Sequence, residues 1–204
     1  MVGISTKTCK TCRRLGMSVC GRGKCALKRK PYPPGIHGKA KRRGLSEFGT
    51  QLQEKQKLKL SYGLRERQFK NYLLSAIKQK TMNTADAVLY YLESRIDNFV
   101  FRAGFASTRA FARQLVSHGH ILLNGKRVTI PSYRVKIGDE VSIREGSKSK
   151  NVFKDLNSSL KKYEAPVWIS LDKEKITGRV AGLPQTEDLK SIYNINTIVE
   201  FYSR

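Results

Sequence analysis

The chain has 204 residues, 39% of them hydrophobic, and 40 Lys and Arg against 16 Asp and Glu, which gives a net charge of +24. This charge opposes compaction and predicts a polyanionic partner, with nucleic acid as the leading candidate and a membrane surface as the rival. No apolar run approaches the roughly 20 residues of a spanning helix, and the N-terminus lacks a signal-peptide core, so we expect a cytoplasmic protein of one or two small domains.

The basic residues are concentrated near the N-terminus. Residues 1–45 hold 13 Lys and Arg residues and no acid, whereas residues 156–204 hold seven bases against six acids. We therefore predict that the N-terminal segment has the closest contact with the polyanion and that the C-terminal segment packs on protein. A solvated basic tail is the alternative for residues 1–45, and the cysteines there argue against it.

All four cysteines lie in this segment, as Cys9-x-x-Cys12 and, seven residues later, Cys20-x4-Cys25. Two close pairs can fill the corners of one tetrahedral site at sulfur–metal distances of about 2.3 Å. Neighbouring Lys and Arg residues favour thiolate over thiol. We predict one structural zinc ion, which would supply most of the stability of so short a module. Two disulfides, which are rare in the cytosol, and free or iron–sulfur-bound thiols are the alternatives.

Residues 28–44 (KRKPYPPGIHGKAKRRG) contain three prolines and three glycines, which oppose regular secondary structure. One interpretation is a disordered basic linker. The other is an extended arm, stiffened by its prolines, that lies along phosphates and offers Tyr32 for stacking. Composition favours the two equally. His37 is interpreted first as an RNA-facing or turn residue and only then as a spare metal ligand.

Apolar residues that recur at three and four positions predict helices over residues 46–60, 65–80 and 83–104. Each apolar stripe is interpreted as core, and the outward surface of the first two helices is basic. No cluster of Cys, His or carboxylate side chains lies on these stripes, which argues against a buried catalytic centre.

The stretch 107–128 (STRAFARQLVSHGHILLNGKRV) predicts a short helix, a tight break and a β-hairpin. Ser107 or Thr108 can cap the helix, and Gly119 can end it in a left-handed conformation. Asn124-Gly125 favours a type I′ turn because both central residues need positive φ. Such a hairpin would bring cationic side chains together in a geometry that suits a phosphate backbone.

Helical spacing assigns the side chains of this short helix to faces. Phe111, Leu115 and His118 fall on one stripe, and Arg109 and Arg113 form a separate pair on the surface. Further along the chain, alternating apolar residues predict short strands at 133–137, 141–143, 167–171, 176–180 and 197–202, with a loop at 145–151 and a weak helix at 154–163.

Several stretches resemble a known family. The run LESRIDNF at residues 92–99, the stretch 107–128 and the segment PSYRVKIGD resemble the small RNA-binding domain named after small-subunit ribosomal protein S-four. The N-terminal CKTC, the arm, LQEKQKLKLSYGLRERQF and the terminal VEFYSR resemble the bacterial family of that ribosomal protein itself. The resemblance covers essentially the whole chain.

The resemblance implies an α+β fold, with a helical domain that carries an N-terminal zinc knuckle and basic arm, plus a small α/β-hairpin RNA-binding domain. The expected divisions are the zinc knuckle and basic extended arm at 1–45, the helical domain at 46–92, the RNA-binding domain at 93–155, and a C-terminal segment with short strands at 156–204 that packs back on the helical domain.

The resemblance also implies a function. Members of the family are non-enzymatic constituents of the small ribosomal subunit that bind rRNA at a multi-helix junction of the 5′ domain early in assembly. They contact another ribosomal protein near the mRNA entry path, where they influence decoding accuracy, and some repress their own mRNA. Some carry a four-cysteine zinc site; this sequence resembles those, with a shorter loop between Cys12 and Cys20. The expected partners are rRNA, neighbouring ribosomal proteins and, as a further candidate, mRNA, with no membrane and no small-molecule substrate.

The candidate site residues are the metal ligands and a set of RNA-binding side chains. The expected ligands of one Zn²⁺ ion are Cys9, Cys12, Cys20 and Cys25. The expected RNA-binding residues are Arg13, Arg14, Arg29, Lys30, Tyr32, Lys39, Arg42 and Arg43 in the arm, Lys55, Lys57, Arg65 and Arg67 on the first helices, and Arg95, Arg109, Arg113, His118, His120 and Lys126 in the hairpin domain. Binding should rest on phosphate neutralisation and shape more than on base identity.

Two further expectations concern single residues and rival functions. One of His118 and His120 should pack against the domain while the other reaches RNA, and Asp97 is interpreted as an orienting partner for a nearby arginine. An RNA-modifying enzyme and a regulatory binder of mRNA are the alternative functions. The enzyme would need a catalytic constellation that the sequence does not bring together in one place.

Overall fold

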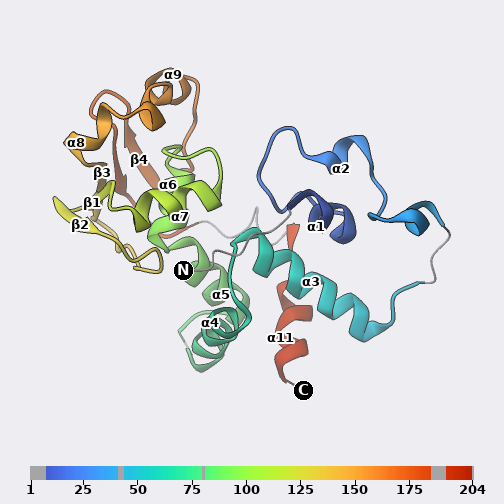
Figure 1. The fold of residues 1–204 in the computed structure, drawn as a ribbon. Coiled ribbons are helices and arrows are strands. Elements are labelled where there is room, and N and C mark those ends of the chain that lie inside the picture. The colour runs from blue at the N-terminus through green and yellow to red at the C-terminus, as the bar shows by residue number, and fades with distance from the viewer. Residues whose placement is uncertain (1–7, 41–43, 80, 185–191, 204) are drawn as a thin grey trace. The chain divides into compact units, whose positions relative to one another are not determined.

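The structure is a computed structural model that describes residues 8–40, 44–79, 81–184 and 192–203. The chain forms two compact units (Figure 1). Unit 1 combines the residues up to Val88 with the C-terminal residues from Glu187, and unit 2 is Leu89–Thr186. The division falls inside one helix, α5. Among the described residues, no helix has the length and apolar character needed to cross a membrane.

Unit 1 is helical. Its elements are α1 (Thr8–Leu15), α2 (Ala26–Arg29), the 3-10 turn η1 (Ile36–Lys39), α3 (Glu47–Ser61), α4 (Glu66–Lys78), the start of α5 (Thr84–Glu93), and α11 (Ile195–Ser203). The two long helices agree with the predicted ones. α3 begins at Ser46, whose Oγ accepts the N–H of Gly49 at 3.2 Å, as expected of an N-cap.

The last element of unit 1 corrects a prediction. Residues 197–202 were expected to form a strand, but they lie in α11, which packs along α3 (Figure 1). Ile195 and Ile198 are buried at helical spacing, and the ring of Phe201 lies 5.5 Å from that of Phe48 on α3. Burial of this face against α3 outweighs the β-propensity of the sequence.

The predicted third helix is two helices. α5 ends at Glu93, and α6 (Ile96–Arg102) begins after an extended residue, Arg95. The break exists because the backbone pairs there with a distant segment: Ile96 N donates to Tyr133 O, and Val135 N donates to Ser94 O, each at 2.8 Å. The strand predicted at 133–137 is therefore reduced to an isolated bridge between Arg95 and Arg134.

Unit 2 is built on a five-stranded antiparallel sheet in the order β2-β1-β3-β5-β4. The strands are β1 (Ile121–Leu123), β2 (Lys126–Val128), β3 (Glu140–Ile143), β4 (Ile169–Asp172) and β5 (Thr177–Val180). β4 and β5 therefore belong to the sheet of unit 2, whereas the prediction assigned their segment to the helical domain. The loop predicted at 145–151 contains α8 (Glu145–Lys148) and the start of the 3-10 turn η2 (Asn151–Phe153). The weak helix predicted at 154–163 corresponds to α9 (Leu156–Lys161).

The core of unit 2 lies between this sheet and the helices α6 and α7 (Arg109–Ser117). Phe99 of α6, Leu115 of α7 and Val141 of β3 are almost fully buried in it, and the Trp168 ring meets Phe99 edge-on at 5.8 Å. This aromatic pair joins a helix to the segment that leads into β4. The core therefore fixes α7 and the β1–β2 hairpin on one framework.

The local signals of the predicted helix and hairpin are confirmed. Thr108 is the N-cap of α7, with its hydroxyl oxygen accepting the Phe111 N–H at 3.2 Å. Gly119 follows the helix with φ of 71°, and Asn124 and Gly125 in the β1–β2 turn have φ of 48° and 75°. These positive values are what the turn types require.

Candidate nucleic-acid interface and metal centre

The four cysteines converge in unit 1. Cys9 and Cys12 lie on α1, Cys20 lies in the following turn, and Cys25 is the N-cap residue of α2. The sulfur atoms of Cys9, Cys20 and Cys25 all lie within 4.8 Å of one another. Cys12 is fully buried, and its thiol interacts with those of Cys20 and Cys25. The structure therefore places three of the four predicted ligands in one group, and Cys12 lies beside Cys20 and Cys25 but outside that group.

The thiols of this cluster differ in acidity. Burial, with smaller contributions from the Cys20 and Cys25 thiols, raises the pKa of Cys12 to about 12. Burial also opposes ionisation of Cys25, but hydrogen bonds from the Leu27 backbone and from the side chains of Ser18, Cys20 and Cys12 lower its pKa to about 7. A metal cation can displace the protons of thiols that are grouped and hydrogen-bonded to one another, and can then bind the thiolates.

The residues present fit a zinc ion. Thiolates are preferred zinc ligands, and four of them on a tetrahedral ion lie about 3.8 Å apart, for sulfur–metal distances of about 2.3 Å. The three sulfur atoms within 4.8 Å are close to that arrangement. No histidine or carboxylate joins the group among the described residues, so the donor set is sulfur alone.

The basic arm is partly folded rather than extended. Its described residues include η1 and the end of α2, and Arg29, Lys30 and Lys39 are exposed. Two cations lie over the Tyr32 ring, with Arg13 Cζ 4.8 Å and Lys39 Nζ 5.5 Å from its centroid. The ring is therefore already engaged by protein groups. The expected RNA contacts Arg42 and Arg43 lie outside the described residues, and Arg14 is exposed on α1.

Lys55 is part of the interior of unit 1, which corrects the prediction that it contacts RNA. It is 6% exposed; its Nζ lies 2.9 Å from Glu66 Oε1 and 4.4 Å from the centroid of the Phe201 ring. The Tyr202 hydroxyl donates to the same Glu66 oxygen, and Lys59 pairs with the other at 2.7 Å. These contacts fasten α11 to α3 and α4.

The remaining predicted cations of α3 and α4 lie at the surface. Lys57 is half-buried and pairs with Glu54 at 2.6 Å, whereas Arg65 and Arg67 are exposed at the start of α4. A surface pair such as Lys57–Glu54 contributes little to stability and can exchange partners. RNA contact by these three residues stays a prediction.

Arg95 is buried too, which corrects its assignment to the RNA surface. The whole residue is 2% exposed, and its guanidinium binds the carboxylate of Asp97 through two hydrogen bonds of 2.9 and 2.7 Å. Arg113 of α7 binds the same carboxylate, with Nε and Nη2 at 2.9 and 2.8 Å from Oδ2. Asp97 is thus the orienting partner that was predicted, and it serves two arginines.

A second buried carboxylate holds Arg109. Glu93, 1% exposed, accepts from Arg102 Nε and Nη2 at 3.0 and 2.9 Å and from Asn98 Nδ2 at 2.8 Å. Asn98 Oδ1 in turn accepts from Arg109 Nε at 2.8 Å, and the Arg109 guanidinium lies 4.6 Å from the centroid of the Phe101 ring. The side chains of Arg109 and Arg113 keep 23% and 32% exposure, so RNA contact stays a prediction for both.

The two histidines of the hairpin region have different surroundings. His120 Nδ1 lies 2.9 Å from Ser147 Oγ and its ring packs edge-on against Phe153, whereas His118 is exposed. His118 therefore does not share the buried stripe of Leu115, contrary to the prediction. Of the pair, His120 is the one that packs, and RNA contact by either histidine stays a prediction.

Exposed basic residues lie near His120, and sequence reasoning missed most of them. Partial burial and the charges of Lys150, His118, Arg127 and Arg144 lower the pKa of His120. We call His118, Arg127, Arg144 and Lys150 the hairpin patch; all four are exposed. They come from the end of α7, from β2 and from both ends of α8. No spacing rule joins these segments, because only the sheet brings them together.

Arg127 has a defined place in the hairpin patch. Its guanidinium lies directly over Gly119, so close that a Cβ on Gly119 would be 2.1 Å from Arg127 Nε. Arg127 Nη2 also lies 3.5 Å from the carbonyl oxygen of His118. The glycine that ends α7 therefore also makes room for this side chain. Lys126 precedes it on β2 and is exposed.

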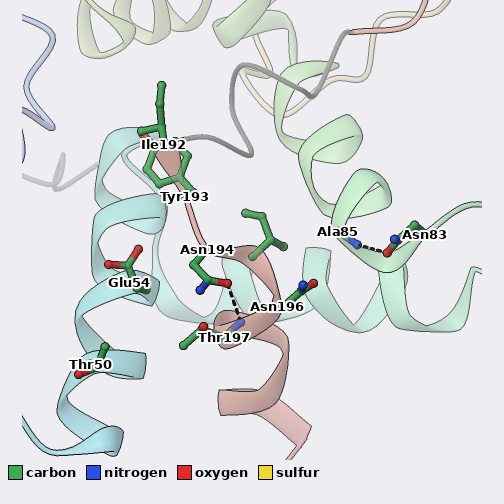
Figure 2. Close-up of a pocket in the computed structure, with 10 residues that line it drawn as sticks. Thr50, Glu54, Asn83, Ala85, Ile192, Tyr193, Asn194, Asn196 and Thr197 are labelled. Atoms are coloured by element: carbon green, nitrogen blue, oxygen red, sulfur yellow. Dashed lines mark hydrogen bonds between the residues drawn. The ribbon is translucent and has the colours of Figure 1, made fainter.

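Unit 1 also contains an open pocket of about 630 Å³ between α3 and the starts of α5 and α11 (Figure 2). Two of its asparagines cap helices: Asn83 Oδ1 accepts the Ala85 N–H at 3.1 Å, and Asn194 Oδ1 accepts the Thr197 N–H at 3.3 Å. Its one carboxylate, Glu54, pairs with Lys57. No histidine, cysteine or second acid lines the pocket in the described part of the chain, so it holds no catalytic set.

Comparisons with known proteins cover most of the chain and agree with one another. Residues 4–93 match the family model of the ribosomal protein S4/S9 N-terminal domain, and residues 94–141 match that of the S4 domain. The chain is 50% identical over 200 residues to small ribosomal subunit protein uS4 of a Geobacillus species, with 97% of this chain and 96% of the relative covered. It is 45% and 43% identical over 202 residues to the proteins of the same name from Thermus thermophilus and Syntrophomonas wolfei, with 96% of both chains covered in each comparison.

Proposed function

Because this chain belongs to the bacterial small ribosomal subunit protein uS4 family, we propose that its exposed cations, and not its buried ones, bind the phosphates of ribosomal RNA. As a member of this family it is a structural constituent of the small ribosomal subunit and not an enzyme. Its partners are ribosomal RNA and ribosomal proteins.

The observation that carries this proposal is the separation of the basic residues of unit 2 into two sets. Arg95 is enclosed and bound to Asp97, so its charge is already neutralised by the protein. The members of the hairpin patch are exposed and close enough to act together on His120. Neutralising phosphates with such a group releases counterions, which supplies affinity without base recognition.

The rest of the proposed RNA surface lies on the arm and the helices. In the described residues it comprises exposed side chains that carry a positive charge: Arg14, Arg29, Lys30 and Lys39 near the arm, Arg65 and Arg67 on α4, and Lys126 on β2. Arg42 and Arg43 are proposed from sequence alone. Arg109, Arg113 and Lys57 are proposed as secondary contacts because each is half-buried and already has an acidic or amide partner.

The domains are proposed to divide these tasks. The zinc knuckle and arm, residues 1–45, would supply a large share of the charge, and the helical domain from residue 46 would present Arg65 and Arg67. The RNA-binding domain from residue 93 would present the hairpin patch on a rigid sheet. Since β5 pairs with β3 and β4 pairs with β5, residues up to 184 are included in this last domain.

The finer functional statements belong to this proposal as well. The chain would bind the 5′ domain of small-subunit rRNA early in assembly, and it would influence decoding accuracy through a neighbouring ribosomal protein near the mRNA entry path. Both statements are supported by the match to the uS4 proteins over at least 96% of the chain. Repression of its own mRNA would be a separate use of the same surfaces.

One Zn²⁺ ion is proposed for the cysteine cluster. Cys9, Cys12, Cys20 and Cys25 would hold it, and the ion would supply cross-linking of α1 to α2 and no reaction, because four thiolates leave no open position. Support comes from the three sulfur atoms within 4.8 Å and from the burial of the fourth thiol.

Recovery of the RNA bound in cells tests this function. The tagged protein should co-purify with small-subunit rRNA and co-sediment with small subunits in low and in moderate salt. In vitro it should bind a 5′-domain rRNA fragment more tightly than an unrelated RNA of equal length. Recovery of mRNA without rRNA would favour the regulatory alternative and contradict the proposal.

A further inference from the structure

The side chain of Arg13 joins the helix that carries two of the cysteines to the backbone of the basic arm. Arg13 Nε donates to the carbonyl oxygen of Tyr32 at 2.8 Å, and Nη2 donates to that of Pro33 at 3.1 Å. The guanidinium carbon also lies 4.8 Å from the centroid of the Tyr32 ring. One planar group thus holds two consecutive carbonyls and one aromatic face. We call this arrangement the Arg13 clamp.

The arm depends on such a clamp because its sequence supplies few backbone hydrogen bonds of its own. Three prolines between residues 31 and 34 have no N–H to donate. The N–H groups of Gly38 in η1 and of Ala40 directly after it donate to the carbonyl oxygens of Gly35 and His37, at 3.2 and 3.1 Å. The Gly38 backbone lies against Pro33, so closely that a Cβ would be 2.1 Å from the carbonyl oxygen that Arg13 binds. By binding the Pro33 carbonyl oxygen, Arg13 therefore also fixes the backbone against which Gly38 of η1 packs.

The other end of the clamp is anchored by the cysteines. α1 has only eight residues, and a helix of that length is not stable alone in water. It is held through Cys9 and Cys12, whose partners lie in the following turn and at the start of α2, and through Gln53 of α3, which donates to Leu15 O at 3.2 Å. Since Arg13 directly follows Cys12, whatever fixes the position of that thiol also fixes the guanidinium.

From this geometry we propose that Arg13 is a positioning residue which makes the order of the basic arm depend on metal occupancy of the cysteine site. The two N–H groups bound to carbonyls serve the arm and not the RNA. Exposed Arg29, Lys30 and Lys39 would then meet the phosphates with a preset spacing. This last step rests on the proposed RNA-binding function, whereas the link between metal and arm does not.

Arginine is needed for this role. Its guanidinium offers a flat fork of donors that spans two neighbouring acceptors and stacks on a ring, whereas the lysine ammonium is a point charge that cannot do both. Arg13→Lys therefore keeps the charge and most of the side-chain volume while it removes the fork. Lys10→Ala is the matched control, because Lys10 is exposed on the same helix.

Hydrogen exchange of the Gly38 and Ala40 amides in the full-length chain is the direct test. In the wild type, removal of zinc with a chelator should speed their exchange at least about tenfold, from the loss of two charge-assisted hydrogen bonds. Zinc-loaded Arg13→Lys should exchange as fast as the chelated wild type, although it still binds one zinc ion. Chelation of zinc from that variant should speed exchange little further. Zinc-loaded Lys10→Ala should exchange as slowly as the zinc-loaded wild type.

Three results would overturn the proposal. Exchange in Arg13→Lys as slow as in the wild type would show that the clamp does not order the arm. Slow exchange in the chelated wild type would show that the order of the arm does not depend on the metal. The absence of bound zinc in the purified protein would show the same. RNA affinity is measured separately on the same proteins: a loosened arm with unchanged affinity would contradict the RNA role of the arm and leave the Arg13 clamp intact.

Discussion

The guanidinium of Arg95 faces the carboxylate of Asp97 edge to edge, with Nε 2.9 Å from Oδ1 and Nη2 2.7 Å from Oδ2. Both residues are almost completely buried, at 2% and 4% exposure. A pair enclosed in this way cannot reach a phosphate, and removal of Arg95 would leave the buried Asp97 carboxylate with Arg113 as its remaining arginine partner. The pair therefore belongs to the folding of unit 2 and not to RNA recognition.

Arg95→Ala should accordingly lower the free energy of unfolding by about 3 kcal/mol, the lower end of the usual cost of breaking a buried ion pair, because Arg113 still pairs with Asp97. Denaturant unfolding measures the loss. Exposed Lys126→Ala should change stability by less than about 0.5 kcal/mol, as is usual at the surface. If Arg95→Ala kept wild-type stability and only weakened RNA binding, the structural role given to Arg95 would be wrong.

Glu66 should make the attachment of α11 sensitive to acid. Partial burial opposes its ionisation, but contacts with Lys59, the Tyr202 hydroxyl and Lys55 outweigh that effect and lower its pKa from 4.5 to about 2. A carboxylate whose pKa is lower in the folded state adds stability that is fully present above pH 4.5 and is lost as the pH falls towards 2. Because its side chain is 47% exposed, solvent screening keeps this contribution small.

Thermal unfolding of the wild type and of Glu66→Gln between pH 2 and 7 tests this point. The difference in melting temperature between the two proteins should be largest near neutral pH and should shrink below pH 4.5. Glu145→Gln is the control, since its exposed pair with Lys148 joins residues only three apart on α8. A difference for Glu66→Gln that is constant over the whole range would refute the assignment.

Two glycines with the same backbone conformation allow the placement of Arg127 to be tested. Gly119 and Gly125 have φ of 71° and 75°, so alanine at either site costs about 1–2 kcal/mol in strain. A Cβ on Gly119 would also displace the Arg127 guanidinium, whereas a Cβ on Gly125 would meet nothing within 4 Å. The flexible arginine can move away at small cost in stability.

Gly119→Ala and Gly125→Ala should therefore lose similar stability but differ in RNA affinity. We expect Gly119→Ala to bind the 5′-domain fragment roughly threefold to tenfold more weakly, the scale of one lost phosphate contact, and Gly125→Ala to bind like the wild type. Filter binding at fixed salt and chemical unfolding give the two quantities. Equal affinities would show that the position of Arg127 over Gly119 has no part in binding.

Metal analysis can separate a four-cysteine site from a three-cysteine site. The purified protein should contain one zinc ion, and Cys12→Ser should bind it markedly more weakly, because a thiolate ligand is lost. Ser18→Ala, which removes only a hydroxyl 3.8 Å from Cys20 Sγ, should retain the metal. Unchanged zinc affinity in Cys12→Ser would restrict the site to Cys9, Cys20 and Cys25.

Sequence reasoning succeeded where the signal is local. The cap at Thr108, the left-handed Gly119 and the Asn124-Gly125 turn each follow from the conformational preferences of one or two residues. The cysteine spacing likewise predicted a cluster whose members are close in sequence. These features need no knowledge of distant segments.

Sequence reasoning failed where the conformation or burial of a residue depends on a partner that is distant in the sequence. The pattern of residues 83–104 is helical throughout, but backbone pairing with Tyr133 and Arg134 breaks the helix at Arg95 and encloses that side chain. Lys55 looks like a surface residue until Glu66 and the C-terminal Phe201 come to lie beside it. Burial of a charge depends on partners far along the chain, which periodicity does not reveal.

The salt dependence of RNA binding tests most directly the claim that exposed cations of the hairpin patch bind phosphates. The logarithm of the association constant for a 5′-domain rRNA fragment would be measured against the logarithm of KCl concentration for two triple variants. One carries Arg127→Ala, Arg144→Ala and Lys150→Ala; the other carries Lys161→Ala, Lys162→Ala and Lys175→Ala, which removes the same charge from exposed residues elsewhere in unit 2.

Each phosphate contact contributes about 0.7–0.9 to the slope of this plot, so loss of three should make the slope of the hairpin-patch variant shallower by roughly 2 to 3. The control variant should keep the wild-type slope. A wild-type slope in the hairpin-patch variant, or an equal reduction in both variants, would contradict the proposed interface.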